Sequence, residues 1–134
     1  MNTLRNPAIC ILLMMLVGCS SCSTLAPGAD AIVVRAEQTA DASFKTINSF
    51  LEYERNNRAA LWKIDRGIKH TADKIRVLAP AQIKALRDAT KEYKRVKSQE
   101  HIDTVDLWLA EVAALVGQAQ MALAQANTKL GRTP

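Results

Sequence analysis

The 134-residue sequence predicts an all-α fold, an elongated antiparallel three-helix bundle whose middle helix is kinked at Pro80. Beyond the first 28 residues, Pro80 is the one proline before the C-terminal Pro134, and Gly67 and Gly117 are the two glycines before Gly131. Apolar residues in this part recur every three or four positions, as on one face of a helix, and do not alternate as in strands. Four shorter helices are the alternative, because proline removes a backbone donor and can break a helix.

The first helix is expected over residues 31–63, with Asp30 as its N-cap. Its apolar pattern weakens through residues 54–57, but neither glycine nor proline forces an end there, so one helix is expected. The predicted stripe consists of Val33, Ala36, Ala40, Phe44, Ile47 and Leu51. Two i,i+4 ion pairs are expected along it, Asp41 with Lys45 and Glu54 with Arg58.

The second helix is expected to begin after Asp65, a suitable N-cap, and to continue past the kink at Pro80. Ser98 is expected to end this segment and to cap the last helix, over residues 99–129. The three segments have matching lengths and short connections, which favours antiparallel neighbours. The bundle domain is therefore expected over residues 30–130, followed by a tail, 131–134.

A separate signal occupies the first 22 residues. The apolar run 8–18 follows a positively charged start; it is too short for a spanning helix, which needs about 20 residues, and has the length of the apolar core of a signal peptide. It ends in Leu16-Val17-Gly18-Cys19, which resembles the lipobox of bacterial lipoproteins. The resemblance implies cleavage of signal peptide 1–18 between Gly18 and Cys19, and lipidation and N-acylation of Cys19.

The resemblance also implies an address for the chain. Residues 19–29 are small and polar and are interpreted as a flexible tether between the lipidated Cys19 and the bundle. Ser20 is not the aspartate that resembles an inner-membrane retention signal, so a cell-envelope location is expected, at the outer membrane facing the periplasm in a diderm cell. Cys22 is then the one remaining thiol after loss of Cys10.

The chain has a net charge of +5, and residues 80–97 form a basic run with six Lys and Arg against Asp88 and Glu92. A candidate face for an anionic lipid or a cell-wall polymer consists of Lys84, Arg87, Lys91, Lys94 and Arg95. The favoured interpretation is different, because an acidic segment without Lys or Arg follows Ser98. A turn at Ser98 would place three pairs together at the surface: Lys94 with Asp103, Lys91 with Asp106 and Arg87 with Glu111.

The chain offers little for catalysis. His101 and Asp103 are two residues apart and do not share a helix face, so neither a metal site nor a cofactor is expected at His101, Asp103 and Asp106. No Ser/His/Asp set, Cys/His pair or glycine-rich phosphate loop can be assembled, so no catalytic residue is assigned. His70 is expected at the surface, and Trp62 and Trp108 in the core.

Residues 112–126 are apolar on nearly all sides, from Val112 to Ala126. This half-helix is either central to the bundle or the site of self-association or of a protein partner. The sequence favours a non-enzymatic, membrane-anchored interaction lipoprotein. A binding module for anionic lipid or cell-wall polymer through residues 84–97 and a phage or mobile-element accessory lipoprotein are the alternatives. The inferred compartment argues against nucleic acid.

Overall fold

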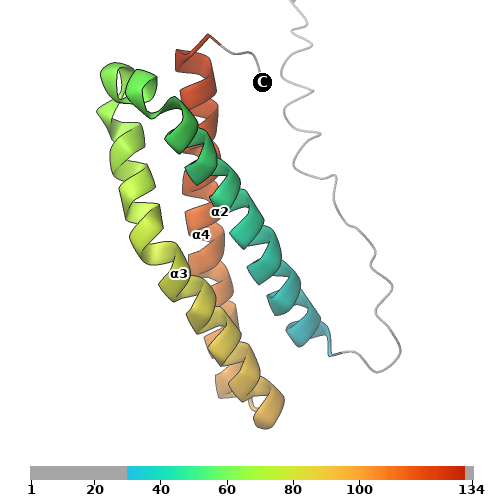
Figure 1. Ribbon diagram of the computed structural model, residues 1–134. Helices are drawn as coiled ribbons and strands as arrows, with labels where there is room; N and C mark the ends of the chain where they lie inside the picture. Colours follow the sequence, from blue (N-terminus) through green and yellow to red (C-terminus); the bar gives the residue numbers. More distant parts are fainter. Residues whose placement is uncertain (1–29, 132–134) are drawn as a thin grey trace, which may run out of the picture.

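A computed structural model describes residues 30–131, which form three long helices and no strand (Figure 1). They are α2 (Ala31–Ile64), α3 (Arg66–Arg95) and α4 (Gln99–Lys129). α3 runs antiparallel to both α2 and α4, and every pair of helices is in contact (Figure 1). The predicted all-α three-helix bundle is confirmed. The predicted signal peptide, lipobox, lipidation site Cys19 and tether lie outside the described residues, as do residues 132–134 of the predicted tail.

The helices begin where the sequence predicts them to begin, because a polar side chain caps each one. Asp30 and Asp65 each accept backbone N–H groups of the following turn, and so does Ser98. The shortest such hydrogen bonds join Asp30 Oδ1 to the Ile32 N–H at 3.1 Å, Asp65 Oδ1 to the Gly67 N–H at 2.7 Å, and Ser98 Oγ to the His101 N–H at 3.3 Å. Asp65 is also the C-cap of α2, so one residue connects α2 to α3.

Pro80 lies inside α3 and does not end it. The alternative of four shorter helices is therefore wrong. The ribbon of α3 changes direction near its middle but stays helical (Figure 1). Ala79 and Ile83 are both buried, at 4% and 6% exposure, so packing on either side of the proline holds the helix together despite the missing donor.

The core contains one apolar stripe from each helix, and three residues predicted to belong to it lie elsewhere. Phe44 is 52% exposed, and Ser43 takes the core position one turn before Ile47. Trp62 and Trp108 are half-buried at the edge of the core, not inside it. α4 packs a face of decreasing side-chain size toward its end, which consists of Val105, Leu109, Val112, Leu115, Ala119, Ala122 and Ala126. This face agrees with the interpretation that the apolar half of α4 is central to the bundle.

Two capping aspartates also join helices that are distant in sequence. Asp30 Oδ2 accepts a hydrogen bond from Tyr93 Oη at 3.2 Å and pairs with Lys97 Nζ at 2.9 Å. Asp65 Oδ2 pairs with Lys129 Nζ at 2.7 Å. Hydrogen bonds from Lys97 and Lys129 lower the pKa of Asp30 and of Asp65, respectively, below the ordinary value. Each aspartate therefore caps one helix and holds the end of another.

Candidate functional site

The basic run of α3 pairs with α2, not with α4. Arg87 Nη2 lies 3.0 Å from Asp41 Oδ1, and Lys94 Nζ lies 2.5 Å from Glu37 Oε1. The predicted pairing with the acidic start of α4 is therefore wrong, and so is the expected pair of Asp41 with Lys45. The acidic residues of α4 have other partners: Asp103 accepts from Gln99 at 2.8 Å, Asp106 faces Arg35 at 3.6 Å, and Glu111 accepts from Gln82 at 3.3 Å.

The error has a geometric cause. α3 has two antiparallel neighbours, so counting residues from a turn identifies a matching height on both of them. Counting back from Asp65 places Arg87 beside Asp41 and Lys94 beside Glu37, as observed. A side chain of α3 can contact α2 or α4, depending on which of the two helices its side of α3 faces. The number of residues between that side chain and Ser98 does not show which side this is.

The candidate anionic-ligand face is largely neutralised within the molecule. Besides Arg87 and Lys94, Lys84 pairs with Asp88 at 2.5 Å and Arg95 with Glu92 at 2.7 Å. Among the described residues, Lys91 is the one member of this face without an ion pair. The face consequently offers an anion one uncompensated cation instead of five.

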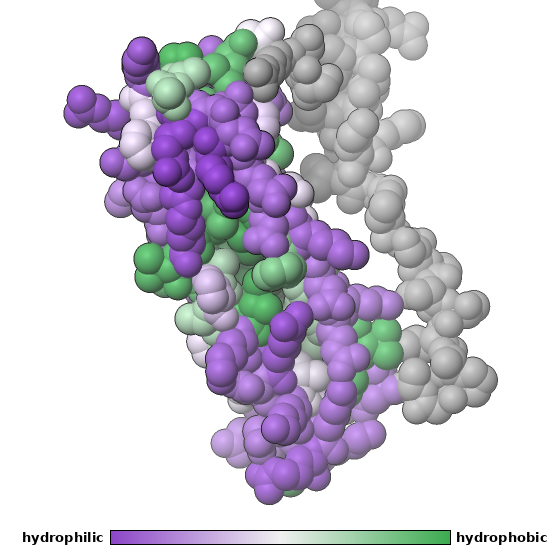
Figure 2. Space-filling model, viewed as in Figure 1, coloured by the Kyte–Doolittle hydropathy of each residue, from purple (hydrophilic) through white to green (hydrophobic). Residues whose placement is uncertain are grey.

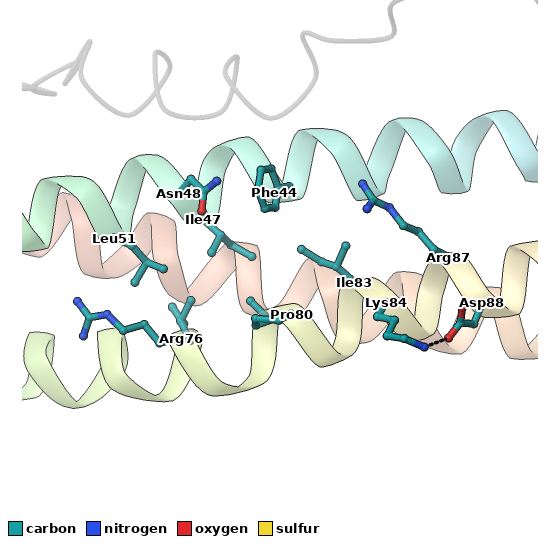
Figure 3. A pocket seen from close by; sticks show the side chains of 12 residues that line it. Phe44, Ile47, Asn48, Leu51, Arg76, Pro80, Ile83, Lys84, Arg87 and Asp88 are labelled. Atoms are coloured by element: carbon teal, nitrogen blue, oxygen red, sulfur yellow. Dashed lines mark hydrogen bonds and ion pairs between the residues drawn. The ribbon is translucent and has the colours of Figure 1, made fainter.

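A groove between α2 and α3 is lined mainly by apolar side chains. Figure 2 shows it as a hydrophobic area between hydrophilic ends, and Figure 3 shows Ile47, Leu51 and Ile83 directed into it. Its volume is about 380 Å³. The twelve residues that line it are Phe44, Ile47, Asn48, Leu51, Ile75, Arg76, Ala79, Pro80, Ile83, Lys84, Arg87 and Asp88.

The charges on the rim of this groove are already engaged. Lys84 and Asp88 pair with each other across one helical turn (Figure 3). Arg87 reaches across to Asp41. The exposed ring of Phe44 forms one lip. The groove can therefore accept an apolar side chain, but it offers no free charge that would select a particular ligand.

A buried carboxylate, that of Glu54, joins α2 to α3 in the part of their interface near the α2–α3 turn. Glu54 is 0% exposed, and it forms the i,i+4 pair with Arg58 that the sequence predicts. Its Oε1 accepts from Arg58 Nε and from Trp62 Nε1, both at 3.1 Å. Its Oε2 accepts from Arg58 Nη2 at 3.2 Å and from Arg76 of α3. Arg76 also pairs with Asp73 at 2.7 Å, so Glu54 and Arg76 each have more than one polar partner.

This environment keeps Glu54 ionised. Burial raises the pKa of its carboxyl, but hydrogen bonds from Arg58 and Arg76 lower it by more, so the pKa lies below the ordinary value. Both oxygens are occupied by donors. A carboxylate of this kind is a poor general base, and its role is to join α2 to α3.

Trp62 completes this cluster. Its indole N–H is donated to Glu54, and two cations lie against its ring: Arg58 at 5.1 Å and Lys69 at 4.3 Å from the ring centre. Such cation–π contacts hold Lys69 of α3 against α2. The half-buried position of Trp62 follows from these contacts, because its polar edge points inward and its ring is covered by charged side chains.

The outer face of α4 is an exposed apolar stripe. Leu107 and Met121 are 57% and 62% exposed. Together with the small residues between and after them they follow alternating steps of three and four, as in a coiled-coil seam. The stripe, called the outer stripe below, consists of Leu107, Ala110, Ala114, Gly117, Met121 and Ala124. Within Val112–Ala126, therefore, one face belongs to the core and another is largely exposed.

Gly117 is the middle of the outer stripe. A Cβ placed there would meet no heavy atom within 4 Å, so packing inside the bundle does not require glycine. Glycine in an exposed helix interior costs about 1 kcal/mol relative to alanine. The position does allow another helix to approach α4 closely. α4 is also the one described helix that is long and apolar enough to span a membrane, a test that core helices of soluble bundles pass as well.

The remaining candidate positions do not converge. Within residues 30–131, no group of three or more His, Cys, Asp or Glu side chains is placed to hold a metal ion. His101 Nδ1 lies 2.7 Å from Ser98 Oγ, at the helix cap, and His70 is exposed, as the sequence predicts. Comparison of the chain with models of protein families, with curated proteins and with solved structures found no match.

Sequence reasoning missed the burial of Glu54, although the chain contains a signal for it. Glu54 lies four residues after Phe50 and seven before Leu61, both fully buried, so it occupies a core position of the α2 stripe. Charged residues are almost never fully buried unless they are paired. An acidic residue at a core position with Arg58 one turn away is a pattern that predicts a buried ion pair.

Proposed function

We propose that the protein is a lipid-anchored, non-enzymatic helical module of the cell envelope that docks a partner protein on the outer stripe of α4. The outer stripe is the observation that carries the docking part of the proposal. It presents two large apolar side chains and four small ones in a row, and the segment from Val112 to Thr128 has no charged residue. Exposed apolar surface of this kind is typical of protein–protein contacts.

The anchoring part rests on Leu16-Val17-Gly18-Cys19 and its resemblance to a lipobox. A chain lipidated at Cys19 would be held by two or more acyl chains, which is what stable membrane attachment requires. The tether precedes Asp30, the N-cap of α2, so the membrane would hold the bundle by the end that contains the start of α2. In a diderm cell the proposed location is the outer membrane, facing the periplasm.

The nature of the outer stripe favours a helix as the partner element. Small residues at Ala110, Ala114 and Gly117 allow backbones to approach, and Leu107 and Met121 provide side chains that insert between those of the partner. The acidic side chains at the start of α4 lie beside this seam. A partner helix with cations near one end would therefore dock in one orientation.

Mass spectrometry of the chain isolated from envelopes tests the anchor. The wild type is expected to lack residues 1–18 and to carry acyl chains on Cys19. Cys19→Ala is expected to leave an unlipidated precursor, whereas the matched change Cys22→Ala leaves processing unaltered. Acyl chains on Cys22, or an intact segment 1–18 in the wild type, would contradict the anchoring proposal.

Site-specific photo-crosslinking tests the docking surface. A photoreactive side chain at Ala113, beside the outer stripe, is expected to yield one defined crosslinked product in intact envelopes. Ala114→Arg in the same chain should abolish that product, because a buried unpaired charge would oppose docking. Ala59→Arg, on the exposed side of α2, is the matched control and should leave it. Equal loss from both substitutions would contradict a docking site on α4.

A further inference from the structure

Cations and carboxylates are distributed unequally between the two halves of the bundle. The proximal half, residues 30–47 and 81–114, contains the start of α2 and the α3–α4 turn. It holds eight Lys and Arg residues and nine Asp and Glu residues. The distal half, residues 48–80 and 115–131, contains the α2–α3 turn and holds eight cations but only four carboxylates. The net positive charge of the domain therefore lies in the distal half.

The distal surplus is also unpaired. Of the eight cations there, Arg58 and Arg76 are bound to Glu54, and Lys129 is bound to Asp65. The other five have no ion pair within residues 30–131 and are exposed or half-buried. They form what we call the distal basic cluster: Arg55, Lys63, Arg66, Lys69 and Lys74. In the proximal half, by contrast, only Lys45 and Lys91 lack an ion pair among the described residues.

Burial of Glu54 contributes to this surplus. Glu54 is one of the four carboxylates of the distal half, but it is fully enclosed by its donors and projects no charge to the surface of its own. Glu52 is the one distal carboxylate without an ion pair in the described chain. The surface near the α2–α3 turn is thus more positive than the basic run of α3, although that run is the more conspicuous feature of the sequence.

The position of the cluster limits its partner. α2 has 34 residues, so its C-terminal end lies about 50 Å from Asp30, where the tether joins. The cluster is therefore at the opposite end of the bundle from the proposed anchor. With the bundle held at Asp30, the cluster can therefore reach well beyond the membrane that would hold Cys19, and this reach favours a ligand other than the headgroups of that membrane.

The aromatic side chain nearest the turn is not free to insert into a bilayer, although Ile64 beside it is 48% exposed. Trp62 is the aromatic residue closest to the turn, and it is half-buried, with its N–H donated to Glu54 and Lys69 against its ring. A membrane-binding tip typically presents Trp or Phe to the interface. The cluster presents five cations on two helices, and an excess of unpaired cations attracts a polyanion.

We infer that the distal basic cluster binds an anionic polymer of the cell wall, one that carries carboxylate or phosphate groups at repeated intervals. The inference goes beyond docking on α4 and uses the proposed anchoring only to choose a polymer over a lipid surface. A protein held by its proximal end and bound to the wall by its distal end would span the space between membrane and wall.

Co-sedimentation of the full chain with purified cell-wall sacculi, in mild detergent, tests the inference. Wild-type binding should be strong at 0.1 M NaCl and lost at 1 M, where the Debye length falls from about 10 Å to about 3 Å. The triple variant Lys63→Gln, Arg66→Gln, Lys74→Gln should bind about 100-fold more weakly, since each cation at an anionic surface contributes about fivefold. The matched control, Lys84→Gln, Lys91→Gln, Lys94→Gln, removes the same charge and should bind like the wild type.

Soluble competitors distinguish a polymer from a lipid headgroup. Poly-glutamate should displace the wild type from sacculi, and glycerol phosphate at the same total charge should not. Displacement by glycerol phosphate would overturn the polymer assignment. Equal loss in the triple variant and its control, both helical by circular dichroism, would overturn the location, and salt-insensitive binding or none would overturn the inference altogether. The assay requires neither acylation nor the outer stripe, so its failure is separate from failure of the proposed function.

Discussion

The two halves of the bundle hold their helices together in different ways. In the proximal half, exposed ion pairs link α3 to α2 in a row, among them Arg87 with Asp41 and Lys94 with Glu37. In the distal half, one buried carboxylate, Glu54, gathers donors from both helices. Exposed pairs contribute little each, whereas a buried ion is costly to leave unpaired. The stability of the distal half should therefore depend strongly on one residue, Glu54, whereas no single ion pair should be critical for the proximal half.

This difference also explains where charge remains available. Most cations of the proximal half form ion pairs with carboxylates of the same half, so its surface is close to neutral. The distal half satisfies its buried carboxylate with two arginines and leaves five other cations unpaired in the described chain. A dense basic run in a sequence is thus a poor guide to a basic surface when an acidic helix lies beside it.

Removal of Glu54 should have the largest effect on stability. Glu54→Ala removes the shared partner of Arg58, Trp62 and Arg76. Because Arg76 is 32% exposed and keeps its pair with Asp73, the loss should lie at the lower end of the range for breaking a buried pair, about 3 kcal/mol. Urea unfolding followed by circular dichroism measures the change in the free energy of unfolding. Asp88→Ala is the matched change in the proximal half, where the carboxylate is 59% exposed and pairs only with Lys84. It should cost less than about 1 kcal/mol. Similar losses in the two variants would contradict the contrast between the halves.

Replacement of Pro80, at the boundary between the halves, should increase the stability of the fold. The structure places it within a continuous helix and on the exposed side, so alanine there restores a backbone donor without creating a cavity. Pro80→Ala is expected to stabilise the fold by about 1–3 kcal/mol, measured as a higher urea midpoint. A destabilised variant would indicate that the bend at Pro80 is needed to fit α3 between its two neighbours.

Acid should weaken both halves. The pKa values of Asp30, Glu54 and Asp65 all lie below their ordinary values in the folded chain. The unfolded state therefore takes up protons first as the pH falls. Stability should be fully present above about pH 5 and decline as the pH drops through about 4 and below. Urea midpoints from pH 7 to pH 3 measure the decline, and Glu54→Gln should reduce it. An acid response unchanged in Glu54→Gln would exclude Glu54 as a contributor.

A double-mutant cycle should resolve the partner of Arg87, with a smaller effect. Arg87→Glu is expected to cost under about 1 kcal/mol, because both side chains of the pair with Asp41 are more than half exposed. Asp41→Arg in the same chain should restore part of that loss, whereas Glu111→Arg should not. Rescue by Glu111→Arg would favour the pairing of α3 with α4 that the sequence alone suggests.

The helices could be predicted from the sequence because their limits are decided locally. Asp30, Asp65 and Ser98 cap helices through bonds to residues two or three positions away, and proline and glycine are scarce between them. The ion pairs could not be predicted in the same way. They depend on which of two neighbours faces each side of α3, a property of the assembled bundle.

The candidate sites divide along the same line. The apolar character of α4 was evident from its sequence, but the separation of its core face from the outer stripe required the other two helices. The distal basic cluster had no sequence signature, because its cations belong to two helices and are interspersed with other residues. Its prominence arises only after the carboxylates around it are assigned to partners.

Competitive amine acylation of the intact chain tests the central contrast most directly, because one limiting reaction compares lysines of both halves. Lys63 and Lys74 have no ion pair in the described chain, whereas Lys94 and Lys97 are bound to Glu37 and Asp30. A hydrogen bond to Asp30 also raises the pKa of Lys97, which lowers its reactive neutral fraction. Mass spectrometry should therefore show faster labelling at Lys63 and Lys74 than at Lys94 and Lys97. Equal rates in the two halves, or faster labelling of Lys94 and Lys97, would contradict the account.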